Sequence, residues 1–276
     1  MKEKTAEEAV RRYWREFRLI QLLRWILLAL YIWFLWEFAT GEMGDSRWWF
    51  LIHLASLAVL WLCLRGVRLI NSIHYMGLER ILNEDCDPVK YAEVCRLLGK
   101  RMKKSTGMIR LNEAKGLCQA GRFREAAALM DEVELDRRSG LAGAILYQNV
   151  AFNCALRLGE DLRAGELRRQ TARLLEKKKP GRRLRAAGEL LLSIMDSGLA
   201  FQRGDYETLR RIEAGLEGQY TVPLQHMAAS VRLAQADLAE GKRKRPKGGC
   251  GQWLRRAARC GWRKKPAACC AKWLNK

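Results

Sequence analysis

Two long apolar runs near the N-terminus constrain this chain more than any other feature. The first extends from Leu19 to Phe38 and the second from Trp48 to Leu64, and a short loop with two acidic residues joins them. A bilayer core about 30 Å thick needs about 20 helical residues, and about 17 suffice. Both runs therefore predict transmembrane helices, arranged as a hairpin over residues 19–66, with the lipid bilayer as a partner.

The few polar side chains within the runs are compatible with a membrane. A charge at mid-span costs about 2.5–3.5 kcal/mol on insertion scales, whereas each Leu, Ile or Phe contributes about 0.3–0.6 kcal/mol in favour. Arg24 lies off-centre, from where a guanidinium reaches the headgroups. His53 either marks a proton path or is neutral and bonded to the partner helix, which is the default. The alternative for the pair, two buried helices of a soluble protein, needs a large apolar core.

Basic residues flank the runs unevenly. Six Lys and Arg residues precede the first run in residues 1–18, the connecting loop carries only Arg47, and Arg65, Arg68 and Arg80 follow the second run. Because Lys and Arg concentrate on the cytoplasmic side of membrane proteins, we expect both termini in the cytosol. We interpret the chain as an integral protein of a bacterial-type inner membrane. In that reducing compartment, its nine cysteines are expected to be thiols.

The rest of the chain has the pattern of an all-α protein. It has five prolines in 276 residues and almost no strand-like alternation. Residues 67–86 are expected to continue the second span as a juxtamembrane helix, with apolar anchors on one side at Leu69, Ile73, Met76 and Ile81. From residue 87 to residue 241, helical apolar spacing alternates with short breaks. Asp87 and Pro88 suit the N-cap and first position of a helix.

Glycines recur where these apolar stretches are interrupted. Gly121, Gly159, Gly204 and Gly241 follow one another at intervals of 38, 45 and 37 residues. The first three each end one helical stretch and precede another. A glycine there suits a helix C-terminus and a tight turn into an antiparallel partner. The recurrence predicts stacked helical hairpins, with a non-repeating helical bundle as the alternative.

In residues 87–241 the chain resembles the tetratricopeptide-like superfamily. That pattern places a glycine at the hairpin turn, an aromatic residue two positions later and a small residue three beyond that. The first turn matches this pattern completely, with Gly121, Phe123 and Ala126. The second has Gly159, Asp161 and Ala164, where Asp161 replaces the aromatic residue. The third has Gly204, Tyr206 and Leu209, where Leu209 replaces the small residue. The resemblance implies a helical-repeat solenoid behind the membrane hairpin. It also implies a scaffold that binds a cytosolic protein or peptide along a groove.

Candidate groove residues are polar or aromatic positions on the expected inner helices: Tyr147, Asn149, Asn153 and Ser193. Asn149 and Asn153 are four positions apart and share a helix face. The alternative for all four is packing between helices.

The sequence gives no indication of catalysis or of a cofactor. It lacks the HExxH, Walker A, GxSxG and GxGxxG motifs, so we do not expect an enzyme. Four late cysteines could in principle bind zinc, but they lack the usual C-x₂₋₄-C spacing: Cys250, Cys260, Cys269 and Cys270. His74 is expected to be a surface or packing residue.

The C-terminal tail, residues 242–276, is strongly basic. It has thirteen Lys and Arg residues, no acidic residue and three tryptophans. This mixture suits an anionic membrane leaflet, which we favour, or nucleic acid. The candidate contacts are Lys242, Arg243, Lys244, Arg245, Lys247, Arg255, Arg256 and Trp262. A capping helix pair and a shifted reading frame at the gene's end are the other interpretations of the tail.

Overall fold

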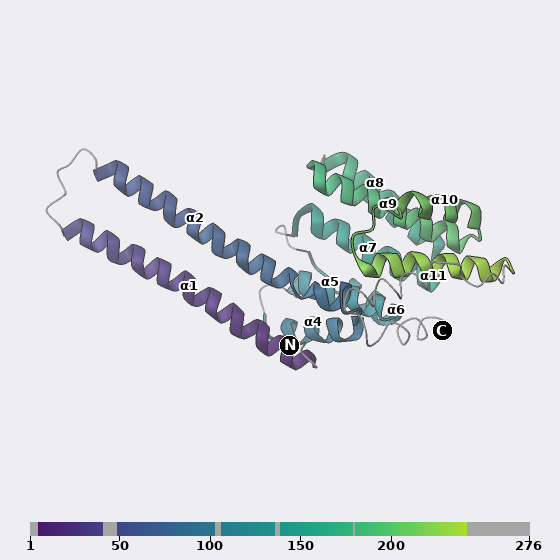
Figure 1. Ribbon diagram of the computed structural model, residues 1–276, viewed down its shortest axis with the longest axis horizontal. Helices are drawn as coiled ribbons and strands as arrows, with labels where there is room; N and C mark the ends of the chain where they lie inside the picture. Colours follow the sequence, from purple (N-terminus) through teal and green to yellow (C-terminus); the bar gives the residue numbers. More distant parts are fainter. Residues whose placement is uncertain (1–4, 41–48, 103–105, 136–138, 179, 242–276) are drawn as a thin grey trace. The chain divides into compact units, whose positions relative to one another are not determined.

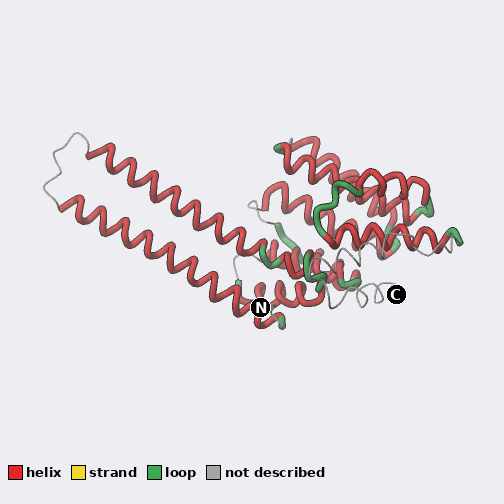
Figure 2. Tube along the Cα trace, viewed as in Figure 1, coloured by secondary structure: helices red, strands yellow, loops and turns green. Residues whose placement is uncertain are grey.

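The protein is all-α, as its composition predicts. The computed structural model describes residues 5–40, 49–102, 106–135, 139–178 and 180–241, and in these ranges it contains helices and no strand (Figures 1 and 2). The chain divides into two compact units, Met1–Arg80 and Ile81–Lys276.

The first unit is an antiparallel pair of long helices (Figure 1). Helix α1 extends over Ala6–Thr40 and α2 over Trp49–Met76. At about 1.5 Å per residue, their 35 and 28 residues span about 52 and 42 Å. Thr5 caps α1, because its Oγ1 accepts a hydrogen bond from the amide of Glu8 while Glu8 Oε2 accepts one from the amide of Thr5. Helix α1 therefore begins well before the apolar run, inside the basic flank.

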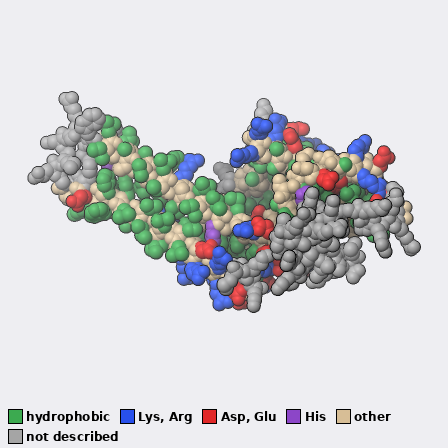
Figure 3. Space-filling model, in the orientation of Figure 1, with side chains coloured by type: hydrophobic (Ala, Val, Ile, Leu, Met, Phe, Trp, Pro, Cys, Tyr) green, Lys and Arg blue, Asp and Glu red, His purple; other side chains and the backbone are tan. Residues whose placement is uncertain are grey.

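Large apolar side chains cover the outside of this helix pair. Trp25, Trp36 and Leu62 are 67%, 69% and 60% exposed, and Figure 3 shows hydrophobic side chains along most of the pair. Continuous apolar surface of this kind marks a membrane or partner interaction. Both helices are long and apolar enough to cross a membrane.

The segment after the second run differs from the expectation. Helix α2 ends at Met76, a turn follows at Gly77 and Leu78, and the short α3 covers Glu79–Asn83. The helical hydrogen-bond pattern changes at this point, because the Leu78 amide bonds to the Tyr75 carbonyl three residues back. Residues 67–86 are therefore not one continuous helix. The expected apolar anchors are divided as well, since Leu69, Ile73 and Met76 are exposed whereas Ile81 is buried.

The second unit consists of paired helices joined by short turns. They are α4 (Pro88–Arg101), α5 (Thr106–Gln119), α6 (Phe123–Asp131), α7 (Gly140–Leu158), α8 (Asp161–Lys178), α9 (Arg182–Gln202), α10 (Tyr206–Leu216) and α11 (Pro223–Ala239). Asp87 caps α4 by accepting a hydrogen bond from the Lys90 amide at 3.1 Å, and Pro88 occupies the first helical position. Both were predicted from the sequence.

The same glycine cap recurs at each predicted break. Gly121, Gly159, Gly204 and Gly241 have φ angles of +80°, +79°, +73° and +69°, in the left-handed region. At the first three, the glycine amide bonds to the carbonyl three residues back, and the next amide bonds to the carbonyl five residues before it. This is the Schellman motif. The partner helix then begins two residues after the glycine, at Phe123, Asp161 and Tyr206.

The helix pairs are packed in chain order. Helix α5 contacts α6 and α7, α7 contacts α8 and α9, and α9 contacts α10. The largest core cluster follows this order from Leu111 on α5 through Phe152 on α7 to Met195 on α9. The position five residues after each of the first three glycines is completely buried, as Ala126, Ala164 and Leu209, although Leu209 is larger than the small residue expected. Each pair thus buries its apolar face partly against the next.

Two Gly→Ala substitutions in neighbouring helices are expected to change stability in opposite directions. Gly159→Ala places a side chain in the left-handed region and should lower the free energy of unfolding by about 1–2 kcal/mol. Gly165→Ala, inside α8 with no atom within 4 Å of the added Cβ, should raise it by about 0.5–1 kcal/mol. Urea unfolding of the detergent-solubilised protein, followed by circular dichroism, measures both. Equal effects would contradict the capping role of Gly159.

Candidate functional site

Helix α7 carries the two asparagines predicted to share a face. The Asn153 side-chain amide donates hydrogen bonds to the Asn149 carbonyl oxygen at 2.8 Å and to Asn149 Oδ1 at 2.9 Å. Both residues are half-buried. The pair is therefore ordered by its own helix, and neither residue is completely buried.

The other two candidate groove residues do not join this pair. Tyr147 is half-buried and packs against the main core cluster, in line with the packing alternative. Ser193 lies on α9, where its hydroxyl donates to the Glu189 carbonyl of the same helix at 3.2 Å. Among the residues that the structure describes, no hydrogen bond links either of them to Asn149 or Asn153.

Arg157 lies one helical turn beyond Asn153 on the same face of α7, and we call Asn149, Asn153 and Arg157 the asparagine row. Arg157 was not among the site residues predicted from the sequence. Positions 149, 153 and 157 are spaced by four and lie along one face of α7. Partial burial lowers the pKa of Arg157, and the nearby charge of Arg232 on α11 lowers it further. The spacing alone could have identified it. The row thus presents two amides and a cation.

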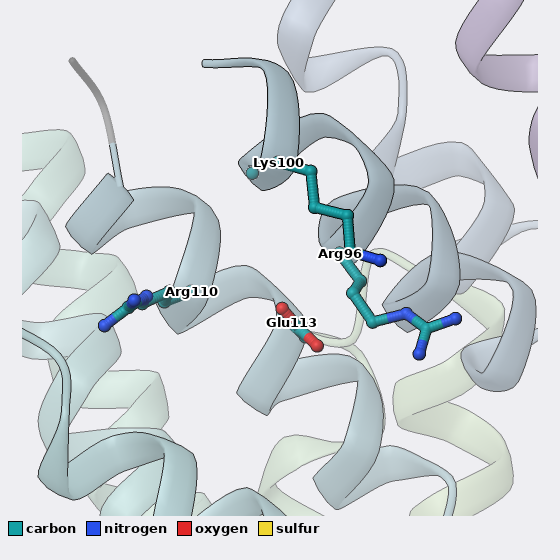
Figure 4. Close-up of a pocket in the computed structure, with 5 residues that line it drawn as sticks. Arg96, Lys100, Arg110 and Glu113 are labelled. Atoms are coloured by element: carbon teal, nitrogen blue, oxygen red, sulfur yellow. The ribbon is translucent and has the colours of Figure 1, made fainter. Parts of the chain in front are cut away.

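A shallow pocket lies between α4 and α5 (Figure 4). Its volume is about 230 Å³, below the roughly 300–1,000 Å³ of ordinary ligand sites. Arg96, Gly99 and Lys100 line it from α4, and Arg110 and Glu113 from α5. In Figure 4 the Glu113 carboxylate lies in the middle, while the Arg96 and Arg110 guanidinium groups extend to opposite sides.

The charges around this pocket are balanced. Arg96 pairs with Glu93 at 2.7 Å, and Arg110 with Glu132 at 3.4 Å. Burial raises the pKa of Glu113, although Arg96 and Arg110 oppose this effect. Because neighbouring carboxylates already compensate the cations, the pocket has little excess charge to hold an anion. The printed ion pairs lie within α4 and between α5 and Glu132, and Glu113 lies between the two arginines.

A buried carboxylate lies where α9, α10 and α11 meet. Glu213 of α10 is 3% exposed and accepts hydrogen bonds from Ser197, from the Tyr220 hydroxyl at 2.6 Å and from Arg232 Nη2 at 2.7 Å. Burial alone would raise its pKa, but the Arg232 charge and these hydrogen bonds outweigh burial and lower the pKa of Glu213. Burial and the bond to Glu213 raise the pKa of Tyr220.

The Glu213 cluster stabilises the fold. A perturbed carboxylate can mark a reactive site, but Glu213 is enclosed and its partners belong to the protein itself. The sequence contained a signal for it, since Glu213 lies four residues after Leu209 and three before Leu216 on the apolar face of α10. An acid at such a position predicts a buried partner.

The remaining candidate residues lie outside the described residues. These are all the basic and tryptophan contacts proposed for the tail, and the four cysteines from Cys250 to Cys270. The five described cysteines are thiols: Cys63, Cys86, Cys95, Cys118 and Cys154. Hydrogen bonding with Cys154 and burial raise the pKa of Cys118. Within the described ranges, no group of three or more His, Cys, Asp and Glu residues could hold a metal ion.

The chain matches no protein-family model, no curated protein and no solved structure.

Replacing Glu213 is expected to destabilise the protein strongly. Glu213→Gln leaves the half-buried Arg232 without its counter-charge and should lower the free energy of unfolding by about 3 kcal/mol or more. Glu217→Gln, one turn further along and exposed, is the matched control and should change it by less than about 0.5 kcal/mol. Urea unfolding of both variants measures the difference.

The destabilisation caused by Glu213→Gln should also depend on pH. Because the pKa of Glu213 is lower in the folded than in the unfolded protein, its stabilisation is fully present above the unfolded value of about 4.3. It is lost as pH falls through the folded pKa. The stability difference between wild type and Glu213→Gln should therefore shrink as the medium is acidified below that range. A constant difference would contradict the assigned ionisation.

Proposed function

We propose that this protein is a membrane-anchored helical-repeat scaffold that holds a protein or peptide partner at the cytosolic face of a membrane. The anchor is the pair α1 and α2. Its support is the outward-facing apolar surface of both helices, which hydrocarbon accommodates and water does not. The excess of Lys and Arg on the two flanks supports a topology with both termini in the cytosol of a bacterial-type cell.

The described helices of the second unit support a tetratricopeptide-like solenoid. The Schellman cap recurs at Gly121, Gly159 and Gly204, and each helix pair contacts its successor. In a stack of this kind, every repeat contacts only its neighbours, which leaves a long face for binding. The binding surface is proposed to be the α7 face that carries the asparagine row.

The observation that carries the binding proposal is the Asn149–Asn153 pair. Its hydrogen bonds stay within α7, and both residues are only half-buried. Both N–H groups of Asn153 are used within the pair, which leaves the Asn153 Oδ1 as an acceptor and the Asn149 Nδ2 as a donor for an extended peptide backbone. Arg157, one turn along, adds attraction for an acidic group on the peptide. No catalytic role is proposed.

A second proposal concerns the tail. Its thirteen basic residues and lack of acids favour a regulator that binds anionic lipid or, less favourably, nucleic acid. An anchored protein already lies beside the leaflet, which raises the effective concentration of lipid.

Alkaline carbonate washing tests the anchor. Membranes from cells that express the protein should retain it in the pellet, because the apolar faces of α1 and α2 remain in hydrocarbon at high pH. A fragment from residue 81 onward, expressed separately, serves as the comparison and should appear in the supernatant. Release of the full chain into the supernatant would refute the membrane anchor.

Photo-cross-linking in intact membranes tests the binding face. A photoreactive amino acid at position 153 should give a discrete adduct that survives high salt. The same group at Leu162 of α8, which is 92% exposed, should not. Substitution of Asn149 by Ala should weaken the adduct at position 153, with circular dichroism confirming that the helices persist. Equal labelling from both positions would contradict a specific face.

Deletion of residues 242–276 separates the two proposals. If the adduct at position 153 persists without the tail, the scaffold proposal stands. If binding disappears and is salt-sensitive in the full chain, the tail carries the function.

A further inference from the structure

A run of basic residues connects α8 to α9. Residues 177–188 contain six Lys and Arg residues and no acidic residue. Lys177 and Lys178 lie in the last turn of α8, and Arg182 and Arg183 lie in the first turn of α9. All four side chains are exposed, and Figure 3 shows Lys and Arg side chains gathered at this end of the two helices. We call these four residues the basic tip.

Two contacts hold the ends of α8 and α9 side by side. Arg168 of α8 donates two hydrogen bonds to the Asp196 carboxylate of α9, at 2.9 and 2.8 Å. Nearer the turn the helices approach closely, because a Cβ on Gly188 would lie 2.5 Å from Leu175 of α8. The basic tip begins two residues after Leu175 and ends five residues before Gly188. Its four cations therefore lie at the same end of one tightly packed helix pair.

The charge of the basic tip is not compensated by the protein. Within the described residues, none of its four side chains forms a hydrogen bond or an ion pair, whereas the neighbouring Arg185 pairs with Glu189 at 3.6 Å. Lysines in the last turn of α8 complement the dipole of that helix. Arginines in the first turn of α9 oppose its dipole, and that turn contains no acidic residue. Helix stability therefore does not account for the arginines of the basic tip.

We propose that the basic tip docks on the anionic headgroups of the cytosolic leaflet and gives the second unit its own contact with the membrane. The inference rests on the proposed membrane anchor. Lys and Arg side chains close to a negatively charged leaflet are attracted to it. The four side chains do not have to converge on one ligand, because a leaflet presents a plane of phosphates to the whole end of the helix pair. The anchor also raises the effective concentration of these headgroups.

Nucleic acid fits the basic tip less well. Residues 172–192 contain no aromatic side chain for a base to stack on. The tip is also narrow, since packed helices lie about 8–10 Å apart, whereas a single module that binds duplex DNA buries about 600–1,000 Å² of its surface. The shape and composition of the tip therefore favour a lipid surface.

Quenching of a fluorophore by lipid tests the docking. The full-length protein carries a fluorescent amino acid at Ala186, an exposed position one turn after Arg182, in nanodiscs that contain a nitroxide-headgroup lipid. Quenching should be about three-fold stronger with equal amounts of phosphatidylglycerol and phosphatidylcholine than with phosphatidylcholine alone. The combined substitutions should reduce quenching to the phosphatidylcholine level: Lys177→Gln, Lys178→Gln, Arg182→Gln and Arg183→Gln.

A control variant removes the same charge from exposed positions on other helices and at the opposite end of α9. It combines Arg101→Gln, Arg124→Gln, Arg203→Gln and Arg211→Gln, and it should keep the strong quenching. Circular dichroism should show that both variants retain their helices.

The other outcomes overturn the proposal. Quenching that persists in the basic-tip variant, or that is lost equally in the control, would show that these four residues do not dock on the leaflet. Equal quenching in both lipid mixtures, with retardation of an oligonucleotide that the basic-tip variant loses, would identify nucleic acid as the partner instead. Equal quenching in a wild type that resists carbonate would overturn this inference and leave the anchor intact. A wild type that carbonate releases would overturn both.

Discussion

The hydrophobic effect acts on two opposite arrangements of apolar side chains in this protein. Along α1 and α2 they point outward, and Trp36 and Leu62 remain more than half exposed. In the second unit they point inward, and Leu111, Met195 and Leu209 are almost completely buried. The hydrophobic effect is the same in both cases. The difference is that the long helix pair leaves most of its large apolar side chains on the outside, whereas the shorter helices bury theirs against one another.

The pairing of the shorter helices depends on backbone geometry at glycines. A left-handed glycine after α5, α7 and α9 satisfies the last carbonyls of each of these helices and reverses the chain within two residues. Other glycines act through close approach instead. A Cβ on Gly116 would lie 2.9 Å from atoms of Ala92, and one on Gly198 would lie 2.9 Å from Leu156. Small residues thus set how closely α4 meets α5 and α9 meets α7.

Charged groups act differently according to their partners. Glu213 is buried with Arg232, Ser197 and Tyr220, and the cluster joins three helices. Arg210 likewise pairs with Asp237 and Glu240 and connects α10 to the end of α11. A buried ion pair contributes little net stability, but removing one member is costly.

The sequence alone determined the features that depend on local pattern. Run length predicted two helices able to span a membrane, Asp87 and Pro88 predicted the start of α4, and the recurring glycines predicted three helix turns. These succeed because hydrophobic period, capping and left-handed backbone are properties of neighbouring residues. The break at Gly77 was missed because one glycine in an apolar helix is weak evidence of an end.

Only the tertiary structure decided which distant side chains meet. The stacking of Tyr13 on His74, the enclosure of Glu213 and the separation of Ser193 from the asparagine pair all depend on helix register and rotation. A one-residue change rotates a side chain by about 100° around its helix, so no local pattern specifies these contacts. Sequence periodicity therefore identifies the faces of each helix, and packing between helices selects their neighbours.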